Sequence, residues 1–250
     1  MKKKLVGNLS RIWGISLLAM AFISLMSAPA FAIYVTVPGT ADPWLAGMPD
    51  GSTASVIHGF TDTAPGQSPV EVLEPFYAGS MLTFTAATGG VNYGPLYGPY
   101  GPDGRTDMSV NHATGAENGI SDIKAPLSAL LGVFLGPAQP SLSPAPSALD
   151  FSTSSSRDYT SLSPGLQQVF FVGDGYTSGG IQQNVIIPTG ATRFYLGVMD
   201  GYQWGNNLGS FSVDAQNPPP PAAVPEPPTM LLLSSGLFGL VGLRKRLKKV

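Results

Sequence analysis

The sequence predicts an all-β fold, an antiparallel β-sandwich, with a short apolar helix at each end of the chain. Three observations predict it. Glycine and proline contribute 31 and 24 of the 250 residues, which leaves little room for long helices. Short runs of alternating apolar and polar residues, typical of strands, recur between these turn residues. The central part, about 190 residues long, suits one domain with a single core.

The expected strands are short. Alternation predicts half-buried strands at 81–85, 193–199 and 210–214, and the opening segment 33–37 is rich in β-formers. More continuous apolar runs at 130–135, 169–172 and 185–187 favour central strands. Residues 125–131 also suit a helical turn. Seven or more such strands with glycine- and proline-rich connections indicate a sandwich.

Two stretches are expected to be irregular. Residues 137–164 are rich in serine and proline, which predicts a mobile surface insertion. Residues 93–104 contain three Tyr-Gly-Pro triplets, too few for a structural repeat. These tyrosines suit either turn chemistry or a recognition loop, and composition alone does not separate the two.

The charges are distributed unevenly along the chain. Nine of the 13 basic residues lie near the two ends. Between 33 and 223 only Arg105, Lys124, Arg157 and Arg193 remain against 14 acidic residues, a formal charge of −10. Such a region repels phosphate, which excludes nucleic acid as a partner. The chain has no cysteine, so disulfides, thiolate metal sites and a cysteine nucleophile are excluded too.

The N-terminus has the pattern of a secretory signal peptide over 1–32. Three lysines at 2–4 precede an apolar run over 12–26, and Ala30 and Ala32 form a small-residue cleavage pattern. We expect cleavage after Ala32, followed by a secreted domain over 33–216. The alternative is an uncleaved N-terminal anchor. Either arrangement takes the middle of the chain out of the cytoplasm.

The C-terminus combines three features in a fixed order. After a proline-rich linker at 217–223 come Pro225, Glu226 and Pro227, an apolar segment at 229–243 and a basic tail. A plain membrane anchor is the simpler interpretation. The combination over 224–250 closely resembles the PEP-CTERM sorting signal. That resemblance implies export across the inner membrane, a transmembrane helix at 229–243 and recognition and cleavage by an exosortase. The protein then ends at the cell surface or outside the cell.

The search for catalytic residues gives little. His58 and His112 are isolated from other metal-ligand types, and each is interpreted as a surface or turn residue. The sequence contains no Gly-x-Ser-x-Gly elbow and no phosphate-binding glycine loop. We therefore expect no enzyme. A glycosidase carboxylate pair stays an alternative without support from any motif.

The segment 200–207, between two expected strands, concentrates oxygen ligands. It offers one carboxylate, several side-chain amides and exposed carbonyls, and Ca²⁺ takes six to eight oxygens. The alternative is an ordinary turn, because Asp-Gly and Gly-Asn-Asn are common turn sequences.

The segments 194–200 and 205–213 resemble the end of the calcium-dependent galactophilic lectins of bacteria, the PA-I type. Similar segments occur upstream in the same order, at 80–89, 92–95, 100–104, 127–132 and 170–173. The resemblance covers about 70–215. It implies a jelly-roll-like β-sandwich that holds a calcium ion.

The resemblance also implies site residues. The calcium ligands would be the side chains of Asp200, Asn206 and Asn207 and the carbonyl oxygens of Tyr93 and Gln203, with sugar hydroxyls completing the shell. Further ligand-binding candidates in and near these loops are Tyr97, Tyr100, Asp103, His112 and Trp204.

The expected function is a calcium-assisted carbohydrate-binding module associated with exopolysaccharide. The alternative is a structural biofilm or matrix protein without specific sugar binding. A glycan-degrading enzyme is a third hypothesis.

Overall fold

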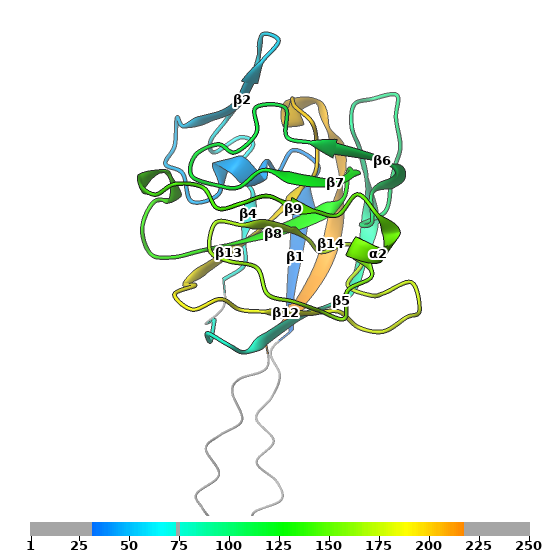
Figure 1. The fold of residues 1–250 in the computed structure, drawn as a ribbon. Helices are drawn as coiled ribbons and strands as arrows, with labels where there is room; N and C mark the ends of the chain where they lie inside the picture. Colours follow the sequence, from blue (N-terminus) through cyan, green and yellow to red (C-terminus); the bar gives the residue numbers. More distant parts are fainter. Residues whose placement is uncertain (1–31, 74–75, 218–250) are drawn as a thin grey trace, which may run out of the picture. The chain divides into compact units, whose positions relative to one another are not determined.

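The structure, a computed structural model, describes residues 32–73 and 76–217 (Figure 1). The predicted signal peptide up to residue 31, most of the proline-rich linker and the C-terminal sorting segment with its predicted transmembrane helix lie outside these residues. Within the described ranges, no helix is long and apolar enough to span a membrane. Strands dominate this region, which confirms the all-β prediction.

Two sheets carry most of the strands. The first is five-stranded, in the order β1-β14-β5-β12-β10. Its strands are β1 (Ala32–Pro38), β14 (Leu208–Gln216), β5 (Met81–Asn92), β12 (Asn184–Ile186) and β10 (Ser161–Leu162). The second has the order β11-β8-β13-β4, from β11 (Val169–Phe171), β8 (Leu130–Leu135), β13 (Arg193–Val198) and β4 (Val70–Glu71). All pairings in both sheets are antiparallel except the short one between β10 and β12.

Smaller elements complete the described region. Strands β6 (Arg105–Asn111), β7 (Ile123–Leu127) and β9 (Leu149–Asp150) form a third sheet. Strands β2 (Thr53–Ile57) and β3 (Phe60–Thr63) form a hairpin that stands out from the sheets (Figure 1). The short helical segments are η1 (Pro43–Leu45), η2 (Pro140–Leu142), α2 (Ser154–Arg157) and η3 (Trp204–Asn206).

All seven strands expected from the sequence are present. The range 130–135 coincides with β8, and the others fall within or next to β1, β5, β11, β12, β13 and β14. The alternation in β5 has its expected cause, because Leu82 and Phe84 are both buried. In β14, Phe211 and Val213 are buried in the same way. Side-chain alternation therefore identified two central strands of the first sheet, and the continuous apolar runs identified β8 and β11 of the second.

Three expectations about local structure were wrong in whole or in part. Residues 125–131 are not helical, because they lie in β7 and β8 and a tight turn at Ser128 joins the two strands. Strand β13 is not half-buried, since its second face is covered: a side chain at Gly197 would meet Ala41 and Pro43. The segment 137–164 is mostly outside helices and strands, as expected, but it is not merely a surface insertion, because it contributes β9, α2 and β10 and buries Phe151 in the core.

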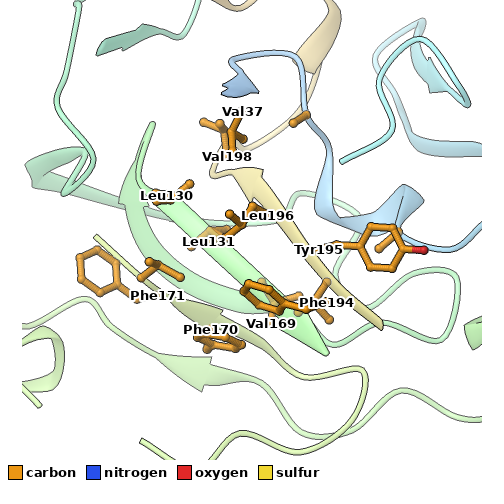
Figure 2. Close-up of a cluster of buried hydrophobic side chains, with 14 of the residues drawn as sticks. Val37, Leu130, Leu131, Val169, Phe170, Phe171, Phe194, Tyr195, Leu196 and Val198 are labelled. Atoms are coloured by element: carbon orange, nitrogen blue, oxygen red, sulfur yellow. The ribbon is translucent and has the colours of Figure 1, made fainter. Parts of the chain in front are cut away.

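The core lies between the two main sheets. The ring of Phe194 in β13 is 4.7 Å from that of Phe134 and 6.0 Å from that of Phe84, which belongs to the other sheet. Figure 2 shows side chains of β8, β11 and β13 converging with Val37 of β1. Each fully buried phenylalanine contributes about 1.5–3 kcal/mol. This core fixes the strand ends from which the site loops extend.

Candidate functional site

A pocket of about 250 Å³ lies where the loop after β13 meets the ends of β5, β6 and β7. We call it the Asp200 pocket. It is lined by Tyr93, Met108, Val110, Leu127, Asp200, Gly201, Tyr202, Gln203 and Asn206. Four of the five calcium ligands that the lectin resemblance implies are among these residues. They come from segments more than 100 positions apart, and the folding of β5 and β14 as neighbours brings them together.

The fifth implied ligand, Asn207, is buried behind the pocket lining, at 4 % exposed. Its Nδ2 donates to the carbonyl of Gly39 at 3.1 Å. This bond fixes the orientation of the amide, because the opposite rotamer would set one oxygen against another. The remaining atom, Oδ1, is buried without a hydrogen-bond partner. Buried polar atoms in proteins are nearly always paired, so this oxygen needs an explanation.

Asp200 is the one carboxylate of the pocket, and it is 7 % exposed. Its Oδ1 accepts hydrogen bonds from the backbone N–H groups of Gly201 at 2.6 Å and Tyr202 at 3.4 Å. Burial raises the pKa of Asp200 to about 6, although the Asn207 amide and these two N–H groups act in the opposite direction. The site therefore holds a desolvated carboxylate that a cation would stabilise.

The backbone around Asp200 turns tightly. Gln203 has a φ of 67°, in the left-handed region that is uncommon for residues other than glycine. Its carbonyl accepts from the N–H of Asn206 at 3.3 Å. The Oδ1 of Asn206 faces the turn that follows β5, because a Cβ added to Gly94 would lie 4.0 Å from that oxygen. The two loops that the sequence singled out thus meet here.

Three tyrosines of the 93–104 segment stack on one another beside the pocket. The ring of Tyr93 is 5.0 Å from that of Tyr97 and 5.8 Å from that of Tyr100, in nearly parallel planes. We call them the tyrosine stack. Arg105 fixes its inner member by donating from Nη1 to the Tyr93 hydroxyl at 2.6 Å. Tyr97 is 53 % exposed, so the stack reaches from the pocket wall into solvent.

Two candidate ligand-binding residues are in the core instead. Trp204 is fully buried and donates from Nε1 to the carbonyl of Val198 at 2.7 Å. His112 is 2 % exposed and stacks on Trp44 at 3.7 Å. Neither ring can touch a ligand in this structure. Of the interpretation of His112 as a surface or turn residue, the surface part was wrong, whereas the turn is present, because the N–H of Gly115 donates to the His112 carbonyl at 2.9 Å. From the sequence, Trp204 and His112 both looked like loop residues, because Trp44, which packs against both rings, is distant in the chain.

The candidate Asp103 lies in a different cavity, of about 320 Å³. Its Oδ1 accepts from the N–H of Asp174 at 3.1 Å. Burial, and then the charge of Asp174, raises the pKa of Asp103. Arg157 and Asp158 of the 137–164 segment line the same cavity. The structure therefore does not bring Asp103 to Asp200.

A second group of buried polar residues, the Asp42 cluster, consists of Asp42, Ser55, His112 and Glu117. Ser55 Oγ is 2.9 Å from His112 Nε2 and 3.1 Å from Asp42 Oδ2. The Oε2 of Glu117 accepts from the Ser55 N–H at 2.9 Å. Burial raises the pKa of Asp42 well above its usual range and lowers that of His112.

The spacing of Ser55 and His112 is that of a nucleophile and its base. However, Ser55 has no exposed surface, so its hydroxyl offers no access to a substrate. Its single hydroxyl proton is also engaged, because Ser55 Oγ donates to Asp42 Oδ2. We interpret the cluster as structural.

Sequence reasoning missed five pocket residues: Met108, Val110, Leu127, Gly201 and Tyr202. The first three are apolar and come from β6 and β7, and no sequence motif predicted that these two strands pair. Tyr202 stood inside the loop that the sequence singled out, and its position beside the carboxylate was the available signal. Within the described ranges, no three His, Asp or Glu side chains converge on a metal position. A cation here would depend on one carboxylate together with amide and carbonyl oxygens.

Comparison with known proteins identifies the C-terminal segment but not the domain. A search of curated proteins found no match for this chain. The lectin resemblance of the domain therefore rests on the residues themselves. Residues 223–246 match the family model of the PEP-CTERM protein-sorting motif. The motif implies export, membrane-anchored sorting before processing, and recognition by an exosortase. It is the sorting signal of an exosortase-sorted extracellular protein.

Proposed function

We propose that this exported protein binds carbohydrate with the help of a calcium ion in the Asp200 pocket. The observation that carries the proposal is the buried Oδ1 of Asn207, which has no partner although the Nδ2 of the same amide is fixed on Gly39. A hard cation is the partner that such an oxygen lacks. The adjacent desolvated carboxylate of Asp200 would supply the charge that holds it.

The donor set suits calcium. Asp200, Asn206 and Asn207 offer side-chain oxygens, and the carbonyls of Tyr93 and Gln203 would bring the total to five. Calcium prefers six to eight oxygens in flexible geometry. Two neighbouring hydroxyls of a sugar would complete the shell, which links ion binding to carbohydrate binding. With one carboxylate in the set, we expect modest calcium affinity.

The proposal extends to the fold and to processing. The shared core of two mainly antiparallel sheets and the position of the Asp200 loop between β13 and β14 support a lectin-like jelly-roll sandwich. The sorting motif supports a location at the cell surface or outside the cell. We further propose that cleavage after Ala32 releases the N-terminus and that 229–243 crosses the membrane until an exosortase acts.

The test is a thermal melt of the purified full-length protein with calcium chloride and with EDTA. A ligand at 100 times its Kd stabilises the folded state by about 2.7 kcal/mol. For a chain of this size, each kcal/mol raises Tm by about 2–4 °C. We therefore expect calcium to raise Tm by about 5–10 °C and EDTA to reverse the change.

Two variants decide whether the shift belongs to the Asp200 pocket. Asp200→Asn should abolish it, whereas the exposed carboxylate variant Asp50→Asn should keep it. An equal shift in Asp200→Asn would contradict the calcium site. A glycan array, read with calcium and with EDTA, then tests the sugar. If no glycan binds in either condition, the structural matrix protein becomes the better interpretation.

A further inference from the structure

An exposed aromatic surface continues from the Asp200 pocket onto the β2–β3 hairpin. Tyr202, which lines the pocket, has its ring 5.6 Å from that of His58 and 6.1 Å from that of Phe60. His58 and Phe60 belong to the turn and to the first position of β3. Tyr202 is 43 % and Phe60 38 % exposed. We call these three residues the hairpin platform.

The platform is held firmly against the loop that forms the pocket. Asp62 of β3, which is 2 % exposed, accepts from the N–H of Trp204 at 3.1 Å and from that of Gly205 at 3.0 Å. One carboxylate thus binds the hairpin to η3, the turn that supplies Asn206. Figure 1 shows the short orange turn before β14 at the same end of the sheets as the hairpin. Asp62 is therefore a positioning residue for both pocket and platform.

A surface that is already ordered costs little entropy on binding. The hairpin is closed by backbone pairing up to Ile57 and Phe60. The aromatic side chains of the platform are partly exposed to solvent, and closing the hairpin does not require that exposure. Aromatic rings exposed beside a polar pocket are suited to the apolar C–H faces of sugars, while the pocket offers oxygens to hydroxyl groups.

Charge narrows the choice of ligand further. Neither the pocket lining nor the platform contains lysine or arginine. Arg105, which donates to the hydroxyl of Tyr93 in the pocket lining, is also engaged with Asp107 at 3.0 Å. The region 33–223 carries a formal charge of −10. An anionic chain and an anionic membrane surface would both be repelled, whereas an uncharged chain would not.

We propose that the ligand is an uncharged polysaccharide chain, with one sugar residue in the Asp200 pocket and the next on the hairpin platform. This inference rests on the proposed function, because it assumes that the pocket holds a sugar. It assigns the platform as a second subsite, which selects chain length. The tyrosine stack borders the pocket as well, through Tyr93.

The experiment measures affinity against chain length by calorimetry, with full-length protein in calcium chloride. The probes are galactose and galactotetraose, with glucose and cellotetraose as a second series. We expect the tetrasaccharide of the preferred series to bind about tenfold more tightly than its monosaccharide. In Phe60→Ala this advantage should fall to about twofold or less, while the monosaccharide affinity stays unchanged.

Two controls keep the result interpretable. Tyr34→Ala removes another exposed aromatic ring, one that neither lines the pocket nor contacts the platform, and should keep the advantage of the tetrasaccharide. The calcium-induced rise in Tm should persist in Phe60→Ala, which shows that the variant is folded with an intact pocket.

Several outcomes would overturn the inference. Equal affinity of the wild-type protein for monosaccharide and tetrasaccharide would refute the second subsite and leave the proposed function standing. Equal loss for both ligands in Phe60→Ala would do the same. Retention on phosphatidylglycerol vesicles that depends on Phe60, without a chain-length effect, would assign the platform to membranes instead. If no sugar of either series binds, the proposed function fails first.

Discussion

The Asp42 cluster and the Asp200 pocket both place a carboxylate out of water, but they treat their polar atoms differently. In the Asp42 cluster, Ser55, His112 and Glu117 satisfy one another, and Trp44 covers them. In the Asp200 pocket, the neighbouring Asn207 keeps a buried oxygen without a partner. Burial raises the pKa of both carboxyl groups.

The difference teaches how to separate a structural polar cluster from a binding site. A closed cluster contributes to the fold because removing any member leaves its partners unpaired. An open one is incomplete by itself and gains stability when a ligand arrives. Asp62 acts on both regions, since its charge raises the pKa of Asp42 and of Asp200.

We expect the largest effect on stability when the side chain that covers the Asp42 cluster is removed. Trp44 is fully buried, stacks on His112 at 3.7 Å and donates from Nε1 to the carbonyl of Ser121 at 3.0 Å. Trp44→Ala should lower the free energy of unfolding by about 3–5 kcal/mol, because it leaves a cavity and exposes the cluster. Urea denaturation measures the loss.

An exposed leucine provides the control. Leu142, which is 77 % exposed, should tolerate alanine within about 0.5 kcal/mol. A loss below about 1 kcal/mol in Trp44→Ala would show that the cluster does not depend on its cover. Trp44→Phe, which keeps a ring over His112, should fall between the two.

The next effect concerns the pH dependence of the open pocket. The pKa of Asp200 is raised to about 6 in the folded protein without calcium, whereas the unfolded chain has the ordinary value near 3.9. The folded state therefore binds the proton more tightly. Ionisation of Asp200 destabilises the fold as pH rises from about 4 to 6, by on the order of 2–3 kcal/mol, and the loss is complete above that window.

Because Asp42 titrates in the same direction, the measurement must be a difference. In EDTA, the stability of Asp200→Asn relative to the wild-type protein should increase between pH 4 and 6 and then stay constant. At pH 7, calcium should stabilise the wild-type protein relative to Asp200→Asn, because the ion favours the ionised carboxylate. A difference that is flat across this range would mean that Asp200 is not desolvated.

The sequence revealed the parts of this molecule that depend on local pattern. Alternation identified β5 and β14, and an uninterrupted apolar run identified β8, because these strands bury the faces that the pattern marks. The oxygen-rich loop after β13 stood out through composition alone. These features need no knowledge of distant contacts.

What the sequence could not provide depends on contacts between distant segments. His112 looked isolated because its neighbours Trp44 and Ser55 lie 68 and 57 positions away. The role of Asp62 depends on a hairpin that docks on a loop 142 residues later. Trp204 looked like a binding residue because the loop around it is polar, yet its ring turns inward to Val198. The periodicity of a sequence contains no information about such contacts between distant segments.

The smallest effect compares one polar side chain from each region. Ser55→Ala removes the hydroxyl between Asp42 and His112, which leaves both without that partner and should cost about 1–3 kcal/mol. Asn207→Ala removes the amide that donates to Gly39 and favours the ionised form of Asp200, but it also removes an oxygen that has no partner without calcium. In EDTA its cost should be smaller than that of Ser55→Ala.

Calcium should invert this order, because Asn207→Ala then also forfeits the stabilisation that the ion provides. Urea denaturation of both variants, with EDTA and with calcium chloride, gives the four values needed. If Asn207→Ala costs more than Ser55→Ala in both conditions, the Oδ1 of Asn207 has a partner in the calcium-free protein. The Asp200 pocket would then be a second closed cluster, and the contrast between the two regions would not hold.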